Sequence, residues 1–353
     1  MAILIVSDLH YEKDRRYKGV DESNSFNNFV KLIEQTQANN VVVLGDIGHA
    51  WTDLDFQQLS ETGAKFYFIY GNHDALDVLK KAKNKDGSNM LMNDGDVVEI
   101  EGFIFAFING IVGNDTKPKE GTLLRSEGDF ESAANKIKET IEAKREKHGE
   151  ARVILCTHAG PDMPENTLLP LTRKSQSFSF RKDAASEAVT HAVEIIKPFL
   201  SFSGHVKFTG FGIYKNKENE ITIGVKVQTS VSEGTYALLK EDTLEIHSLY
   251  NSLVLGDSSH FSASLQKLRD LAGNGISFSS LFSNSDNSLQ EVTPTKGQGT
   301  NTENTTKDSN ESTSAIVSNS NLDTSYNSQE NGTHKKGSKP FLDLFRRLKK
   351  KIM

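Results

Sequence analysis

ILIVSDLH (residues 3–10) is the stretch on which the fold of this chain depends. Four aliphatic residues predict a buried strand, and Asp8 and His10 follow directly where that strand ends. The arrangement recurs in VVVLGD (41–46) and VILCTHAG (153–160), and less purely in FYFIYGNHD (66–74) and FLSFSGHVK (199–207). Open α/β sheets place their ligands at the carboxyl edge of the strands. The five stretches therefore predict that carboxylate, imidazole and amide groups gather at one sheet edge, a donor set that suits one or two divalent cations.

Taken together, the five motifs resemble those of the calcineurin-like metallophosphoesterases. The family pattern reads D-x-H, G-D, G-N-H-[DE], a lone H and G-H-x-H, and it is matched in order over roughly residues 1–250. The resemblance implies an α/β fold (an α+β sandwich) in which two mixed β-sheets pack together and are flanked by helices. Pattern alone does not distinguish this sandwich from a single mixed sheet.

The resemblance also implies a two-metal site and a general acid. The positions that match the family ligands are Asp8, His10 and Asp46 for the first metal, and Asp46, Asn72, His158 and His205 for the second. In this scheme the shared Asp46 bridges two cations, and a hydroxide held between them attacks phosphorus in line with the leaving oxygen. His73 stands at the general-acid position, and imidazole suits proton transfer near pH 7. The native metal stays open among manganese, iron, zinc and nickel, which all accept this mixture of ligands.

Two positions depart from the family pattern. Lys207 stands where the last histidine belongs, and an ammonium group has no lone pair with which to bind a cation. Either the first site keeps three protein ligands and binds its metal loosely, with Lys207 turned away or on the substrate phosphate, or one metal is bound and the lysine replaces the missing charge. His49 stands three residues after Asp46, where many relatives carry a carboxylate that orients the general acid. Asp74 is expected to fix its loop.

Basic residues in two loops are candidates for binding substrate. Arg173 and Arg181 lie between His158 and the next predicted helix, and Arg125 lies in a polar insertion over residues 114–128. Loops that leave ligand-bearing strands shape pockets, so these cations are candidates to clamp a phosphate. The alternative is ordinary solvated loop charge.

Two classes of function remain open. The first is a hydrolase acting on a phosphomonoester or phosphodiester, and the second is a non-catalytic scaffold, such as the retromer scaffold subunit of this family. Residues 45–51 lack the G-D-x-x-D-R-G segment of Ser/Thr protein phosphatases, and about forty-five residues after Lys207 leave no room for the capping domain of repair nucleases. A net charge of −6 also provides no overall basic field for nucleic acid.

Helix and strand signals alternate along the first 250 residues. Helices are expected around 26–33, from Glu131 to about His148 and from about Asp183 to Lys197, where Pro198 ends the last of them. Late strands are expected at 212–214, 221–225, 234–239 and 244–249, and a short helix around 261–271. Cys156, the single cysteine, lies within an apolar strand and is expected to be a small buried residue.

Composition and the family resemblance together predict four parts. They are a catalytic domain (1–250), a short extension with a possible helix (251–273), a disordered Ser/Asn/Thr-rich linker (274–338) and a basic amphipathic helix (339–353). The terminal helix fits an anionic membrane surface best, then a partner protein, then nucleic acid, and alone it would be marginal in water.

The chain begins with an apolar run too short for a signal peptide, and no stretch approaches the ~20 apolar residues that span a bilayer. The expected setting is the cytoplasm, with peripheral membrane attachment as one option. The sequence leaves the oligomeric state open.

Overall fold

A computed structural model describes most of the first 273 residues. The described ranges are 2–12, 16–17, 20–113, 124–148, 152–164, 167–172, 185–206, 208–229, 234–254 and 259–273. All of them belong to one compact unit, Met1–Glu291. The predicted linker and terminal helix lie outside the described residues.

The described strands form two larger sheets and three short pairs. The first sheet contains β1 (Ala2–Val6), β4 (Asn40–Leu44), β5 (Lys65–Ile69), β17 (Thr235–Lys240), β18 (Thr243–Ser248) and β19 (His260–Ser264). The second contains β6 (Val97–Ile100), β7 (Phe103–Ile108), β10 (Arg152–Thr157), β12 (Leu169–Pro170), β14 (Leu200–Ser203), β15 (Gly210–Lys215) and β16 (Ile221–Lys226). The short pairs are β2 (Arg16–Tyr17) with β3 (Val20–Asp21), β8 (Ile111–Val112) with β9 (Leu124–Arg125), and β11 (Gly160–Pro161) with β13 (Ala185–Ser186).

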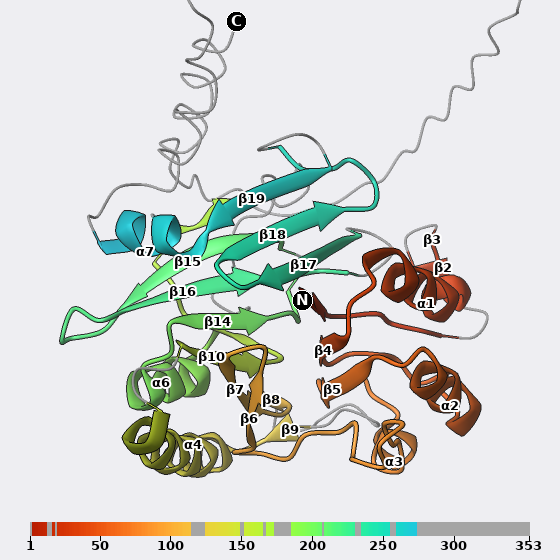
Figure 1. The fold of residues 1–353 in the computed structure, drawn as a ribbon, viewed down its shortest axis with the longest axis horizontal. Coiled ribbons are helices and arrows are strands. Elements are labelled where there is room, and N and C mark those ends of the chain that lie inside the picture. The colour runs from red at the N-terminus through yellow and green to blue at the C-terminus, as the bar shows by residue number, and fades with distance from the viewer. Residues whose placement is uncertain are drawn as a thin grey trace, which may run out of the picture. The chain divides into compact units, whose positions relative to one another are not determined.

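Both large sheets are mixed. The first has the order β19-β18-β17-β1-β4-β5, in which β1, β4 and β5 run parallel and β17 joins β1 antiparallel. The second has the order β12-β15-β16-β14-β10-β7-β6, with a parallel centre from β16 to β7 and antiparallel edges. The predicted α/β architecture of two mixed sheets with flanking helices is confirmed (Figure 1).

The sheets pack face to face because successive strand residues point to opposite faces. Ile3 and Ile5 of β1 lie in the core between the sheets, together with Phe105 and Phe202 of the second sheet. Leu4 of β1 lies in the separate core on the other side of its sheet. Cys156 is fully buried between the sheets and forms no disulfide, as expected.

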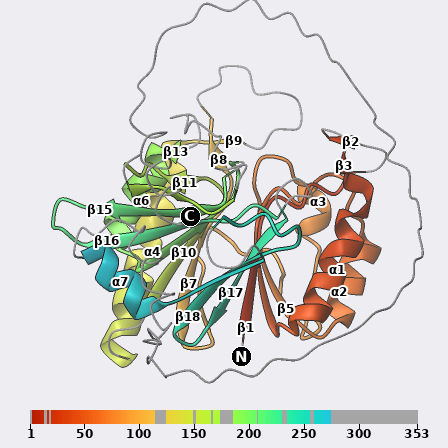
Figure 2. The same cartoon turned by 90° about the horizontal axis from the view of Figure 1, so that it is seen from above.

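Helices cover the outer face of each sheet. The described helices are η1 (Glu22–Asn24), α1 (Ser25–Thr36), α2 (Asp53–Glu61), α3 (Leu76–Leu79), α4 (Glu127–His148), α6 (Glu187–Ile196) and α7 (Leu265–Gly273). Of these, α7 does not cover an outer face, because its buried residues lie in the core between the sheets. Figure 2 shows α1 and α2 beside the first sheet and α4 and α6 beside the second, which gives four layers. No helix in the described part of the chain is long and apolar enough to cross a bilayer.

The predicted elements are largely present, with shifted ends. The helix expected from Glu131 begins at Glu127. The helix expected from Asp183 begins at Glu187, because Ser186 caps it by accepting from the Val189 amide at 3.3 Å, and Ala185–Ser186 pair with Gly160–Pro161. The four late strands are β15 to β18.

The helix predicted over 261–271 is wrong in its first part. Residues 260–264 form β19, which pairs antiparallel with β18, and α7 starts only at Leu265. Phe261 and Ala263 are both buried between the sheets, and this period-two burial is typical of a strand. Because Leu268 of α7 is also buried there, this segment completes the fold and is more than an appendage to it.

Candidate metal centre

The predicted ligands come together where the strand ends of the two sheets meet. Asp8 follows β1, Asp46 follows β4 and Asn72 follows β5, while His158 and His205 follow β10 and β14 of the other sheet. Backbone hydrogen bonds tie these loops together: Asp8 N donates to Gly45 O and His10 N to Asp46 O, both at 3.0 Å. Parallel strands bring these distant segments to one edge, as the strand-end pattern predicts.

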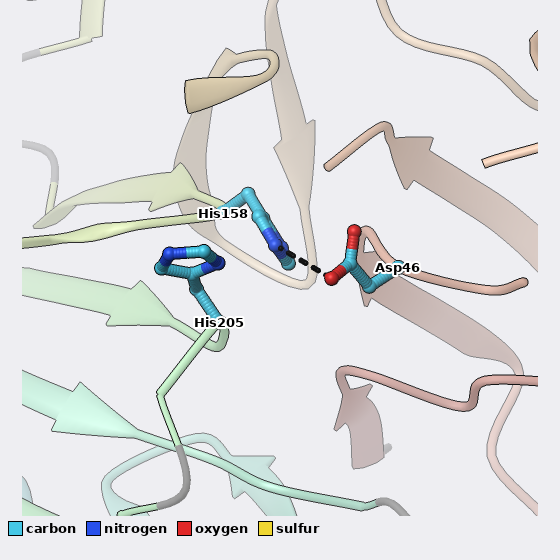
Figure 3. Close-up of side chains that lie close together, drawn as sticks. All are labelled: Asp46, His158 and His205. Carbon is cyan, nitrogen blue, oxygen red and sulfur yellow. Dashed lines mark ion pairs between the residues drawn. The ribbon is translucent and has the colours of Figure 1, made fainter. Parts of the chain in front are cut away.

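Asp46, His158 and His205 form one donor set (Figure 3). One ligand atom from each lies within 4.8 Å of the others, and His158 Nε2 is 3.3 Å from Asp46 Oδ2. His158 is fully buried, and its Nδ1 lies 2.7 Å from the Leu44 carbonyl oxygen. Since a carbonyl only accepts, Nδ1 carries a proton, and this hydrogen bond turns Nε2 toward the site, which is how ligating histidines are oriented.

Buried acceptors beside this set fit a cation. The Asn72 side-chain oxygen is buried and has no hydrogen-bond partner among the described residues, and the buried His158 Nε2 lies 3.3 Å from the Asp46 carboxylate. Buried acceptors normally have partners, because leaving one without a donor costs about 1–3 kcal/mol. A divalent cation bound by imidazole, carboxylate and amide oxygen would satisfy both atoms.

Asp8, His10 and Asp46 form the second donor set, again with one ligand atom each inside 4.8 Å. His10 Nε2 lies 3.6 Å from Asp8 Oδ1, and Asp8 Oδ2 accepts from the His205 amide at 2.9 Å. Asp46 therefore belongs to both sets. Its Oδ1 also accepts the Asn72 and His73 amides at 2.8 Å each, which fixes the carboxylate between the two groups of donors.

Four of these residues adopt an unusual backbone conformation. The φ angles of Asp8, His10, Asp46 and His205 are 56°, 46°, 54° and 64°. Residues other than glycine seldom adopt this left-handed region, and it costs on the order of 1–3 kcal/mol for each residue held there. Such strain is typical of functional sites, and nothing in the sequence indicated it.

Two glycines leave room for the donors. A Cβ at Gly71 would lie 2.3 Å from Asp46 Oδ1 and 2.6 Å from His158 Nε2. A Cβ at Gly204 would lie 1.6 Å from Ser7 Oγ and 2.3 Å from Asp8 Oδ2. The Gly-Asn and Gly-His motifs thus need glycine because the backbone passes directly over the ligand atoms.

The electrostatics of the site favour an added positive charge. Burial lowers the pKa of His158, but the Asp46 carboxylate outweighs it and raises that pKa to about 10. Burial, together with the nearby His158, lowers the pKa of His205 to about 4. In the metal-free protein, a proton is therefore held between His158 and Asp46, and a cation would replace it.

Asp74 holds the loops, as expected. Its two oxygens accept hydrogen bonds from three backbone amides: Asp46 at 3.1 Å, Ile47 at 2.6 Å and Gly71 at 2.5 Å. Burial and the neighbouring Asp46 raise the pKa of this carboxyl to about 6. Asp74 thus connects the loop after β4 to the loop after β5.

The predicted general acid lies at the rim of the site. The His73 side chain is exposed, and its ring centroid is 6.2 Å from that of His10 and 6.2 Å from that of His49. An imidazole therefore lies beside His73 at the position where many relatives have a carboxylate. Partial burial lowers the pKa of His73.

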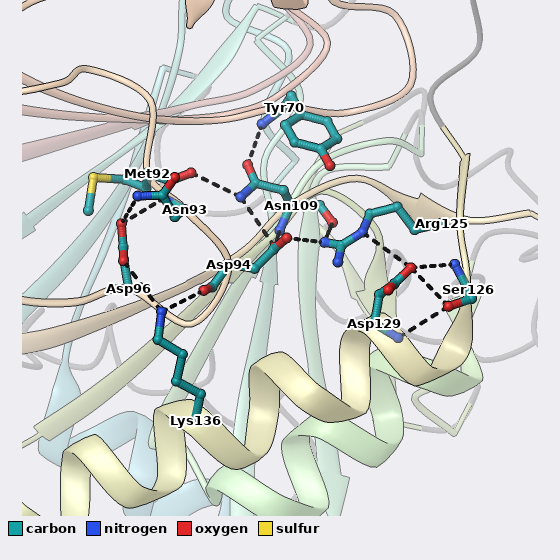
Figure 4. A network of polar contacts seen from close by, with 10 residues as sticks. All are labelled: Tyr70, Met92, Asn93, Asp94, Asp96, Asn109, Arg125, Ser126, Asp129 and Lys136. Carbon is teal, nitrogen blue, oxygen red and sulfur yellow. Dashed lines mark hydrogen bonds and ion pairs between the residues drawn. The ribbon is translucent and has the colours of Figure 1, made fainter.

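Of the four basic residues that are candidates to bind substrate, the structure describes one. Lys207, Arg173 and Arg181 lie outside the described residues. Arg125 is described and is already engaged: its Nη1 lies 2.6 Å from Asp94 Oδ2 and donates to the Asn109 carbonyl at 3.0 Å (Figure 4). Asn109 Oδ1 in turn accepts the Tyr70 amide at 2.9 Å, directly before Gly71. Arg125 thus supports the ligand loop from behind.

Sequence reasoning missed Lys226, the last residue of β16. It is 1% exposed, and its Nζ would lie 3.3 Å from a Cβ at Gly160, two residues after His158. Burial lowers the pKa of Lys226 to about 8, and its charge contributes to the lowered pKa of His205. A lysine that ends an apolar strand normally reaches solvent, so the sequence carried no signal for this burial.

Residues 1–166 match the calcineurin-like phosphoesterase superfamily domain. Among curated proteins, the UDP-2,3-diacylglucosamine hydrolase of Aliivibrio fischeri (strain MJ11) is 32% identical over 114 residues, which are 29% of this chain and 44% of that protein. The chain thus spans less than half the length of this relative.

Three solved structures are similar to this chain. They are a dimetal phosphatase from Danio rerio (TM-score 0.40, 10% identity, 75% of this chain and 98% of that chain), Vacuolar Protein Sorting 29 from Cryptosporidium parvum (0.32, 12%, 74% and 95%) and the phosphopantetheinyl hydrolase of Mycobacterium tuberculosis (0.31, 12%, 64% and 89%). TM-scores this low carry no argument about function.

Proposed function

We propose, from the premise that residues 1–166 belong to the calcineurin-like phosphoesterase superfamily, that this chain is a metal-dependent phosphoesterase that hydrolyses a phosphomonoester or phosphodiester. One observation carries the proposal: Asp46 is shared by two sets of donors, one with Asp8 and His10, the other with His158 and His205. A carboxylate common to two sets is the arrangement that two-metal hydrolysis requires.

The protein's own groups have distinct tasks in this proposal. Asp8, His10, Asp46, Asn72, His158 and His205 would hold the cations. When bound, two divalent cations would neutralise charge on the phosphoryl oxygens and lower the pKa of an attacking water. The backbone amides of Asn72 and His73 keep Asp46 in place, and the Leu44 carbonyl keeps the ring of His158 in place.

His73 would act as the general acid. Its ring is exposed at the rim, so it can reach a leaving oxygen while its backbone stays anchored on Asp46 at 2.8 Å. A protonated imidazole there would donate its proton to that oxygen as the bond to phosphorus breaks. Replacing His73 with Asn should lower kcat about 100-fold or more on an alkyl phosphodiester. The loss should be smaller on p-nitrophenyl esters, whose leaving group needs little protonation.

Activity on bis-p-nitrophenyl phosphate with Mn²⁺, for the wild type and for Asp46→Asn, tests the proposal. The substitution keeps the size of the side chain and removes the shared charge, so we expect kcat/KM to fall by more than about 100-fold. Asp77→Asn is the matched control: this carboxylate is exposed on α3, three residues after Asp74, and should leave activity unchanged. Equal activity of Asp46→Asn and wild type would refute the proposal.

A metal-bound but inactive wild type would favour the second candidate, a non-catalytic scaffold. His49 beside His73 and Lys207 in the first ligand set are the features that favour it. Metal content per chain after dialysis also separates the two alternatives for the first metal site. Two equivalents support two metals, the first of them loosely bound. One equivalent supports a single metal, with Lys207 in place of the charge of the missing cation.

The substrate panel should cover several phosphate classes. UDP-2,3-diacylglucosamine belongs in it because the relative from Aliivibrio fischeri is named for that substrate. Arg173 and Arg181 remain proposed contacts for a flanking phosphate. Their joint replacement with Ala should raise KM for a phosphodiester, and an unchanged KM would remove them from the site.

The chain end is proposed to localise the enzyme. Residues 339–353 combine an apolar face with basic residues, a pattern typical of helices that lie on anionic membranes. Co-sedimentation with anionic vesicles, with and without residues 340–353, tests this. Equal sedimentation would leave a protein partner as the better explanation.

A further inference from the structure

A second group of metal-binding side chains lies on the first sheet, away from the strand ends. Glu245 and His247 are two residues apart on β18, so they share one face of the sheet. His260 on β19 is the direct cross-strand partner of His247. Leu244 and Ile246 are buried between the sheets, so Glu245 and His247 lie on the opposite, outer face.

The geometry of this group fits a small coordination sphere. One ligand atom from each of the three residues lies within 4.8 Å of the others. Glu245 Oε2 is 3.0 Å from His247 Nε2 and 3.8 Å from His260 Nε2. Zinc bonds of about 2.0–2.2 Å in a tetrahedron place ligand atoms about 3.3–3.6 Å from each other, so only small side-chain shifts are needed.

The surroundings keep the imidazoles in place. The Tyr236 ring stacks on His247, with centroids 5.0 Å apart and an angle of 6° between the planes. The two imidazole centroids are 4.6 Å apart. The side chains are only 13–36% exposed and stand on paired strands, which position ligands better than loops.

Lys240 is the competing cation. Its Nζ lies 2.8 and 2.9 Å from the two oxygens of Glu245. This ammonium balances the carboxylate in the metal-free protein and would have to release at least one oxygen when a metal binds. Lys240 would therefore weaken metal binding by these side chains without preventing it.

We propose that Glu245, His247 and His260 form a separate site for Zn²⁺, which would clip β19 to β18. Two imidazoles and one carboxylate leave a fourth position for water, and this donor set suits Zn²⁺ better than Mg²⁺. The proposal is independent of the phosphoesterase activity, because β18 and β19 stand two and three positions away from β1 in the sheet order.

Zinc binding by the full-length, tag-free protein tests the proposal. Equilibrium dialysis at micromolar free Zn²⁺ would compare wild type with the double variant His247→Ala/His260→Ala. We expect the double variant to bind one equivalent less, while the metal centre at the strand ends binds as before. The same stoichiometry in both proteins would overturn the proposal.

His191→Ala provides the matched control. His191 on α6 is also half exposed and lies near two carboxylates, Glu131 at 3.9 Å and Glu194 at 3.7 Å. Loss of this single imidazole should leave the zinc stoichiometry at the wild-type value. If His191→Ala also loses one equivalent, histidine loss in general explains the effect and the proposal fails.

Two further variants distinguish loss of the zinc site from loss of the fold. Glu245→Gln keeps the shape of the site and should also bind one zinc less, with a Tm in EDTA close to that of the wild type. Lys240→Met removes the competing ammonium and should tighten zinc binding at this site about tenfold or more. Weaker binding by Lys240→Met would contradict the assignment of Glu245 as a ligand.

Discussion

Gly71→Ala tests the proposed metal centre most directly, because it leaves every donor in the sequence. Gly71 is not among the glycines with positive φ, so an alanine can adopt its backbone conformation. The new Cβ would lie 2.3 Å from Asp46 Oδ1 and 2.6 Å from His158 Nε2, whereas ordinary Cβ contacts begin at 3.4 Å. One or both donors, or the loop itself, would therefore have to move by about 1 Å.

A displacement of this size exceeds what a metal site tolerates. Metal–ligand distances in such sites vary by about 0.2 Å. A donor atom that moves by about 1 Å therefore no longer binds the cation or cations that it would hold. Misplacement by 1 Å also costs catalysis about 100-fold. We expect Mn²⁺ affinity and kcat/KM to fall by about 100-fold each.

Titration calorimetry with Mn²⁺ and phosphodiester hydrolysis would measure the two effects. Gly128→Ala is the control, because it lies in the first turn of α4 and its nearest neighbour, Ser126 Oγ, is 3.9 Å from the added Cβ. This variant should keep wild-type affinity and gain up to about 1 kcal/mol of stability. A folded Gly71→Ala protein whose Mn²⁺ affinity stays within threefold of wild type would refute the proposed centre.

Three further predictions follow from the same geometry. Asp74→Ala leaves three buried amides without their acceptor and should lower the free energy of unfolding by about 3–5 kcal/mol in urea titrations, whereas Asp77→Ala should cost under about 0.5 kcal/mol. Arg125→Ala removes the contacts to Asp94 and the Asn109 carbonyl and should cost about 2 kcal/mol with KM unchanged; a raised KM at unchanged stability would instead make Arg125 a substrate contact. Because Asp46 raises the pKa of His158 to about 10, metal binding must displace that proton, so Mn²⁺ affinity should fall about tenfold for each unit as pH drops from 9 to 6. Calorimetry at three pH values would show this slope, and pH-independent binding would contradict it.

Local patterns in the sequence were sufficient to predict that the polar motifs gather at one edge of a sheet. In a parallel sheet, every strand that ends in a polar motif delivers it to the same edge, so the positions of Asp8, Asp46 and Asn72 follow from periodicity alone. The distances among the donors did not follow, because they depend on how the second sheet packs on the first. The unusual φ angles at Asp8 and Asp46 are equally invisible in a pattern, since the surrounding fold imposes them.

The roles of the basic side chains were the least predictable feature of the site. Arg125 was a candidate to clamp a phosphate, with solvated loop charge as the alternative, yet its guanidinium is held by Asp94 and supports the ligand loop. No role was predicted for Lys226, yet it is buried beside the loop that follows His158. Charge alone does not say which partner a side chain will meet, because long side chains reach partners distant in sequence.

The sequence by itself indicated that each motif follows a strand, which residues are candidate donors, and a resemblance to the calcineurin-like metallophosphoesterases. Only the tertiary structure decided that Asp46 serves two donor sets and that His247 of β18 faces His260 of β19. The physical reason is that periodicity assigns each residue to a face of its own element. The distance between two faces is set by long-range packing and by register, which short stretches of sequence do not encode.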